Sequence, residues 1–227
     1  MSLWTRITEA LSALASGEGL GTMFDTLRKP PELRVGFAIA VIALGAKMAK
    51  ADGQVTRDEV TAFREVFAIA QADEKSAARV FNLAREDVAG FEDYARKIAT
   101  MFEADSAVLS DLMDGLFHIA VADGTYHPNE DLFLERVAEI FGMSPREFAA
   151  LRARNVPDAA PDPYTVLGVD STMSLADIRK AWRDLVRETH PDRMMARGVP
   201  QEAVKLAQTR LIAINNAWEE IQSHHGG

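Results

Sequence analysis

"ADGQVTRDE", residues 51–59, and "ADGTYHPNE", residues 122–130, carry the same pattern at the same spacing. In both, an aspartate precedes a glycine, an apolar residue follows two positions later, and a glutamate stands seven positions after the aspartate. Apolar residues recur at intervals of three and four on either side of each copy, which is typical of helices. The repeat therefore predicts two helix–turn–helix units of similar sequence, packed about a pseudo-twofold axis.

The second half of an EF-hand calcium loop has a similar pattern, but neither copy fits one. The first two ligand positions of such loops need side-chain oxygens. Here those positions fall on residues that have none: Met48 and Lys50, then Ile119 and Val121. The EF-hand interpretation is therefore excluded for both copies.

A plain turn explains much of the first copy. Gly53 and Gly124 can end their incoming helices in the left-handed conformation. Thr56 and Glu59 then form a capping box at the start of the next helix. Glu59 is thereby accounted for without a metal ion.

The second copy is explained less well. His127 is a poor cap, so the role of Glu130 is less clear, and neither aspartate is needed by a turn. If the two turns meet, four carboxylates converge: Asp52, Glu59, Asp123 and Glu130. Their negative charges would then need a bound cation, or some of the four would have to be protonated. Ligation by oxygen alone suits a divalent cation such as calcium, magnesium or manganese better than zinc. Structural turns and a cation site are both open interpretations.

Composition excludes several classes of function. The 227 residues are 48% hydrophobic and contain no cysteine, which rules out disulfides, thiolate zinc sites and thiol catalysis. The net charge of -9 argues against general affinity for nucleic acid. From Pro163 onward there are 8 basic and 8 acidic residues, so the excess of acid lies upstream and any basic patch lies downstream.

The chain divides into four parts and is predicted to be all-α. Residues 1–29 form an amphipathic helix, with a stripe from Leu3 to Leu14, and a connector; this helix docks on the next domain or at most lies on a membrane surface. Residues 30–154 form a helical bundle, whose run 35–46 is a buried core helix because spanning a membrane takes about 20 residues. Residues 155–162 are a proline-rich linker, and residues 163–223 form a small helical hairpin.

In the hairpin, Ser174 caps a helix that ends in "IRKAWRDLVRETHPD", residues 178–192. Arg179, Arg183 and Arg187 form a basic row on one face, with Lys180 beside it. Pro191 ends this helix, a loop follows, and Pro200 opens the last helix. We expect each of the two helices to bury a tryptophan.

Residues 163–222 resemble a J domain, the module that docks on Hsp70 chaperones. The similarity rests on "DPYTVLGV", on the basic helix running into His-Pro-Asp, and on "INNAWEEI". It implies docking on a DnaK-type Hsp70 and stimulation of its ATP hydrolysis. The residues that match functional positions of the family are His190, Pro191, Asp192, Arg179, Lys180, Trp182, Arg183 and Arg187. Asp184 departs from the family, where a second basic residue is common, and Glu188 dilutes the basic patch.

Residues 31–154 are similar to the TerB domain, an all-helical module whose acidic turns are thought to bind metal. TerB-like and J domains in one chain resemble the DnaJ-like A co-chaperones, which carry an N-terminal membrane helix; from this sequence we expect none. The resemblance implies an Hsp70 co-chaperone in which the TerB-like domain targets or regulates through an unknown protein partner. The alternative is a metal-responsive stress sensor. No secretory signal, nucleophile–base pair or phosphate loop is visible, so we expect a cytoplasmic protein that is not an enzyme.

Overall fold

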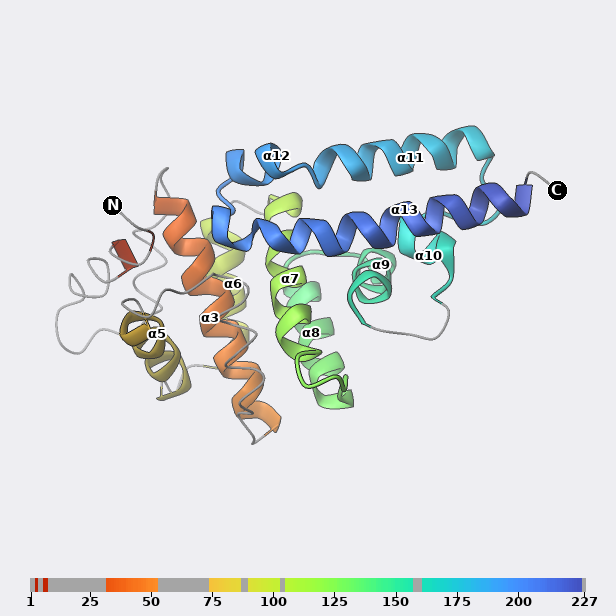
Figure 1. The fold of residues 1–227 in the computed structure, drawn as a ribbon. Helices are drawn as coiled ribbons and strands as arrows, with labels where there is room; N and C mark the ends of the chain where they lie inside the picture. Colours follow the sequence, from red (N-terminus) through yellow and green to blue (C-terminus); the bar gives the residue numbers. More distant parts are fainter. Residues whose placement is uncertain are drawn as a thin grey trace.

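The fold is all-α, as the helical periodicity predicted. The computed structural model describes residues 3, 6, 7, 32–52, 74–86, 90–102, 105–156 and 161–225, and no strand occurs among them. The bundle consists of α3 (Glu32–Asp52), α5 (Glu74–Glu86), α6 (Phe91–Met101), α7 (Ser106–Ala120), α8 (Pro128–Ile140) and α9 (Pro145–Asn155). The C-terminal part consists of α10 (Pro163–Leu167), α11 (Leu175–Glu188), α12 (Pro191–Ala196), the 3-10 turn η1 (Gln201–Val204) and α13 (Lys205–His225) (Figure 1).

Helix α3 is the centre of the bundle. Its residues 35–49 are buried on every side, and it contacts α5, α6, α7 and α8. The prediction of a buried core helix at 35–46 is confirmed. Ile7 is fully buried in the same core and Leu3 packs against it, which agrees with docking of the N-terminal helix at these described positions. None of the helices described is long and apolar enough to cross a membrane.

The helices that lead into the two repeated turns lie together. α3 and α7 contact each other and run in the same direction, so their C-terminal ends lie on the same side of the bundle (Figure 1). Residues 53–73, which contain the rest of the first turn, lie outside the described part of the chain. The pseudo-twofold relation between the two units therefore stays a prediction, with the direction of α3 and α7 consistent with it.

Local capping sets several helix starts. Asp105 begins α7, because its carboxylate accepts hydrogen bonds from the backbone N–H groups of Ala107 and Val108. Ser144 begins α9 with Pro145 at the first helical position, and Glu147 closes the capping box. Helix α8 likewise begins on a proline, Pro128.

Two antiparallel helices, α11 and α13, form the C-terminal hairpin (Figure 1). Their own apolar core includes Ile178, Ile214 and Ile221, with Trp218 buried among them. Trp182 is only half-buried, so the expectation that each helix buries its tryptophan holds for α13 alone.

The segment after His190 differs from the predicted loop. Residues Pro191–Ala196 form the short helix α12. The His190 side chain caps it by accepting from the N–H of Asp192, and Pro191 takes the first helical position. The proline that ends α11 thus also starts a new turn.

The hairpin and the bundle share apolar packing. Met194, Val199 and Ala203, together with Leu206 and Ala207 of α13, belong to the same buried cluster as the core of the bundle. α13 also contacts α7 and α9. The predicted domain limits at 154 and 163 stay predictions, but the two parts are packed on each other rather than separated by open linker.

Candidate functional site

Helix α11 carries the basic face. Its start is fixed by Ser174, whose hydroxyl accepts from the N–H of Asp177 at 3.2 Å and donates to the Asp177 carboxylate at 2.6 Å. Ile178 is fully buried on the side that faces α13. On the other sides the four predicted basic residues are all exposed: Arg179, Lys180, Arg183 and Arg187.

Acidic neighbours divide this basic face. Asp184 Oδ1 lies 3.1 Å from Arg187 Nη1, so Asp184 partly neutralises the last residue of the row. Glu188 forms its ion pairs with Arg193 and Arg197, which follow the tripeptide in the chain, and not with the basic row. Within the described chain, Arg179, Lys180 and Arg183 have no acidic partner, and they form the open positive patch.

The His-Pro-Asp tripeptide spans the start of α12: His190 is the N-cap in the short connection after α11, and Pro191 and Asp192 are the first two residues of α12. The backbone N–H of His190 donates to the carbonyl of Arg187 at 3.3 Å, and Nδ1 of its ring accepts from the N–H of Asp192 at 3.2 Å. A neutral His190 therefore carries its proton on Nε2, which is left as a donor. The side chains of His190 and Asp192 are 60% and 80% exposed, so both are accessible to a partner.

Trp182 has a different role from the rest of the predicted docking set. Its ring stacks on that of Trp218, with centroids 5.3 Å apart. Its indole N–H donates to Asn215 Oδ1 at 3.0 Å. The structure therefore places Trp182 inside the hairpin, holding α11 on α13.

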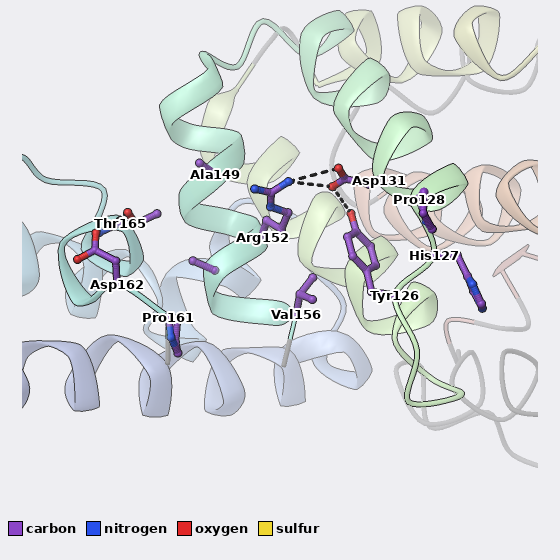
Figure 2. Close-up of a pocket in the computed structure, with 11 residues that line it drawn as sticks. Tyr126, His127, Pro128, Asp131, Ala149, Arg152, Val156, Pro161, Asp162 and Thr165 are labelled. Carbon is purple, nitrogen blue, oxygen red and sulfur yellow. Dashed lines mark hydrogen bonds and ion pairs between the residues drawn. The ribbon is translucent and has the colours of Figure 1, made fainter. Parts of the chain in front are cut away.

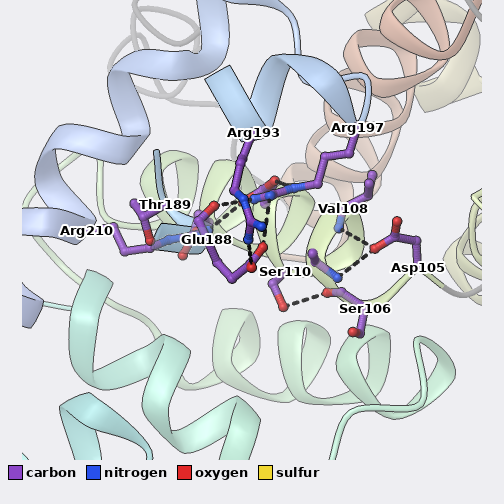
Figure 3. Close-up of polar contacts among 12 residues, drawn as sticks. Asp105, Ser106, Val108, Ser110, Glu188, Thr189, Arg193, Arg197 and Arg210 are labelled. Atoms are coloured by element: carbon purple, nitrogen blue, oxygen red, sulfur yellow. Dashed lines mark hydrogen bonds and ion pairs between the residues drawn. The ribbon is translucent and has the colours of Figure 1, made fainter. Parts of the chain in front are cut away.

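A buried group of charges behind the tripeptide was missed by the sequence reasoning (Figure 3). Arg210 of α13 pairs with Asp111 and Asp114 of α7, and Arg197 donates to Asp111 at 2.7 Å. Asn155 donates to Asp114 at 2.7 Å. A local signal existed, because two acids three positions apart in the apolar stretch "LSDLMDGLF" share one helix face and need partners when buried.

The second acidic turn is held by hydrogen bonds from its own backbone to its two carboxylates. Gly124 has the predicted left-handed conformation, with a φ of 84°, but it lies in the turn beyond Val121, the C-cap of α7, and does not itself end the helix. Asp123 Oδ1 accepts from the N–H of Thr125 at 2.8 Å, and Glu130 Oε2 accepts from the N–H of His127 at 2.8 Å. The expectation that Asp123 is not needed by the turn was wrong, and Glu130, buried at the start of α8, is explained as half of a capping box.

Next to this turn lies a cavity of about 520 Å³ between α8, α9 and the start of α10 (Figure 2). Tyr126 donates to Asp131 at 2.9 Å, and Arg152 donates to the same carboxylate at 3.3 Å. Burial, and then the hydrogen bond to Asp131, raise the pKa of Tyr126 well above its usual range. The tyrosine therefore stays protonated and acts as a donor.

The cation hypothesis has limited support from these residues. Asp123 and Glu130 both already accept backbone hydrogen bonds, so the second turn alone offers no open ligand set. Asp52 is the last residue of α3, while Glu59 lies outside the described residues. In the described ranges no group of three or more His, Asp or Glu side chains could hold a metal ion. A cation shared by the two turns stays a prediction.

Comparison with known proteins agrees with both parts of the chain. Residues 38–153 match the family described as Tellurite resistance protein TerB, and residues 162–224 match the DnaJ domain. One relative is the Co-chaperone protein DjlA of Photobacterium profundum, 25% identical over 92% of this chain and 85% of its own length. Another is the Co-chaperone protein DjlA of Escherichia coli K12, 23% identical over 100% of this chain and 99% of its own.

No solved structure matches the chain significantly. The family matches fall on the two helical units that the structure shows, the bundle around α3 and the hairpin of α11 and α13. The chain therefore belongs to the family of the tellurite resistance protein TerB and carries a DnaJ domain after its TerB domain.

Proposed function

We propose that this protein is a co-chaperone whose DnaJ domain docks on an Hsp70-type chaperone and stimulates its ATP hydrolysis. The observation that carries the proposal is the placement of the tripeptide: His190 and Asp192 are exposed at the end of a helix whose open face holds Arg179, Lys180 and Arg183. The DnaJ match and the names of the DjlA relatives support the same function.

The chemistry of the site suits docking rather than catalysis. A row of exposed cations attracts an acidic surface and orients the encounter, which raises the association rate more than the final affinity. Guanidinium groups also form two parallel hydrogen bonds to a carboxylate, so Arg179 and Arg183 favour one orientation of the partner. In this proposal His190 then acts at the contact with the chaperone, and the DnaJ domain itself performs no bond-breaking step.

The TerB domain is proposed to target or regulate the DnaJ domain through a protein partner of its own. Its support is indirect: the bundle is larger than the hairpin and is packed against it through α13. We propose no cofactor for docking itself.

A single-turnover ATPase assay with a DnaK-type Hsp70 tests the docking proposal. The intact chain should accelerate hydrolysis, and His190→Gln should abolish the acceleration while thermal melting stays unchanged. His224→Gln is the matched control, because His224 is an exposed histidine near the end of α13. Full stimulation by His190→Gln would sink the proposal.

A further inference from the structure

The contact between the TerB and DnaJ domains includes buried charges from both. Asp111 and Asp114 lie on α7 of the TerB domain and are 1% and 2% exposed. Arg210, 7% exposed, comes from α13 of the DnaJ domain. Arg197 follows α12, and its side chain is 12% exposed. Ions this deeply buried interact strongly, because little water screens them.

The two arginines make different connections. Arg210 joins α13 to Asp111 and Asp114, so it fastens one domain to the other without touching the tripeptide. Arg197 donates from Nε to Asp111 Oδ2 at 2.7 Å and from Nη2 to the backbone carbonyl of Glu188 at 3.1 Å. One planar guanidinium thus links a TerB aspartate to the last residue of α11, two positions before His190.

The carboxylate of Glu188 adds ion pairs to this connection between α11 and Arg197. Its carboxylate lies 3.6 Å from Arg197 Nη1 and also pairs with Arg193, the residue directly after the tripeptide. Glu188 and Arg193, on the two sides of His-Pro-Asp, are therefore connected to Arg197 (Figure 3), and Arg197 in turn bonds to Asp111. Thr189, which stands between Glu188 and His190, is buried, and its hydroxyl donates to the carbonyl of Leu185 at 2.8 Å.

The link leaves the docking face open. His190 and Asp192 are exposed, and so are Arg179, Lys180 and Arg183. The TerB domain therefore does not cover the tripeptide. Its contact with the residues beside the tripeptide runs from Asp111 through Arg197. Because the guanidinium of Arg197 has a fixed geometry, a shift of Asp111 moves the backbone at Glu188.

We propose that Asp111 is a positioning residue for the tripeptide: through Arg197 it fixes the end of α11, so that the TerB domain sets how strongly the DnaJ domain stimulates Hsp70. This inference rests on the proposed function. Asp111 does not touch the chaperone. Its effect should appear in the maximal stimulation, while the half-maximal concentration, set by the basic face of α11, stays nearly constant.

Asp111→Asn and Asp114→Asn in the full chain form a matched pair. Both remove one buried negative charge from α7, but only Asp111 contacts Arg197. Asp111→Asn should lower the maximal stimulation of Hsp70 ATPase about three- to tenfold, and Asp114→Asn should leave it near the wild-type value. Arg197→Lys should behave like Asp111→Asn, because an ammonium group cannot replace the fork that reaches both Asp111 and Glu188, and it serves as the test if Asp111→Asn fails to fold.

Hydrogen exchange of the backbone amides of residues 188–198 tests the role of Asp111 independently of the proposed stimulation of Hsp70. Faster exchange of these amides in Asp111→Asn, and not in Asp114→Asn, supports the link between Asp111 and the tripeptide. If the wild-type chain stimulates no Hsp70, that result contradicts the proposed function but leaves the exchange evidence for the link intact. Equal exchange in both variants, or an equal fall in stimulation, would mean that Asp111 only holds the domains together and would overturn the inference.

Discussion

Trp182 of α11 and Trp218 of α13 stack with their ring planes 15° apart and their centroids separated by 5.3 Å. The pair joins the helix that carries the basic face to the helix that packs on the TerB domain. In the proposed function, Trp182 would thus contribute to docking indirectly, by keeping α11 in place.

Trp182→Ala should destabilise the fold by about 3 kcal/mol, because it removes a large ring from a packed pair and leaves a cavity. Trp182→Phe should cost about 1 kcal/mol, since it keeps a stacked ring but loses the hydrogen bond to Asn215. Urea denaturation followed by circular dichroism measures both. Unchanged stability of Trp182→Ala with lost Hsp70 stimulation would instead make Trp182 a direct docking contact.

Asp184→Asn should strengthen docking. The substitution releases Arg187 from its ion pair and removes a negative charge from the face of α11. We expect the half-maximal Hsp70 concentration to fall about two- to fivefold at low salt, because exposed pairs are worth up to about 1 kcal/mol.

The gain should shrink at high salt, where exposed charges are screened. Glu219→Gln is a control of equal charge change, on an exposed position of α13. Equal effects of both variants would show that only net charge matters.

The start of α9 should contribute stability that depends on pH. Hydrogen bonds from the backbone N–H and then the hydroxyl of Ser144 hold the pKa of Glu147 below its usual range. A folded pKa below the unfolded value means that this stability is present above the unfolded pKa and is lost as pH falls through the folded pKa.

Glu147→Ala should therefore cost about 1 kcal/mol at pH 7, a typical capping value, and progressively less in acid. Denaturant melts between pH 7 and pH 3 measure the difference. Glu135→Ala, at an exposed position of α8, should show no such trend. A cost for Glu147→Ala that does not change with pH would argue against the ionised capping box.

A cation shared by the two acidic turns predicts a rise in melting temperature. A divalent ion that binds only the native state, and is present at about 100 times its dissociation constant, adds about 2.7 kcal/mol to the free energy of unfolding. Calcium, magnesium or manganese should raise the melting temperature of the wild-type chain, and Asp52→Asn or Asp123→Asn should remove the rise.

Asp105→Ala provides the contrast, because Asp105 caps α7 and lies outside both acidic turns. Its variant should lower the melting temperature equally with and without ions. If no ion shifts the wild-type chain, the metal-sensor alternative is lost.

Much of the helical fold could be predicted from local pattern. The apolar run at 35–46 predicted the buried helix α3, and Ser174 predicted the start of α11, because both signals lie within a few residues. The exposed tripeptide and the basic row followed from helix periodicity and from resemblance to J domains.

The remaining features depend on contacts that local pattern does not encode. Arg210 lies 99 residues from Asp111, and Arg197 lies 86 residues from it, so nothing near either arginine marks it as buried. The six-residue helix α12 is too short for periodicity and depends on a side-chain cap from His190. One unpredicted contact is local: the Asp123 carboxylate accepts a hydrogen bond from the backbone N–H of Thr125, as aspartates in turns commonly do.

Helix α13 belongs to two cores at once. Leu206 and Ala207 near its start are part of the core around α3, while Ile214, Trp218 and Ile221 further along are part of the hairpin core. A DnaJ domain cut out at the linker would expose the first of these surfaces to water, together with Met194, Val199 and Ala203. We therefore expect the shared helix to couple the stabilities of the two domains, so that each is less stable alone than in the full chain.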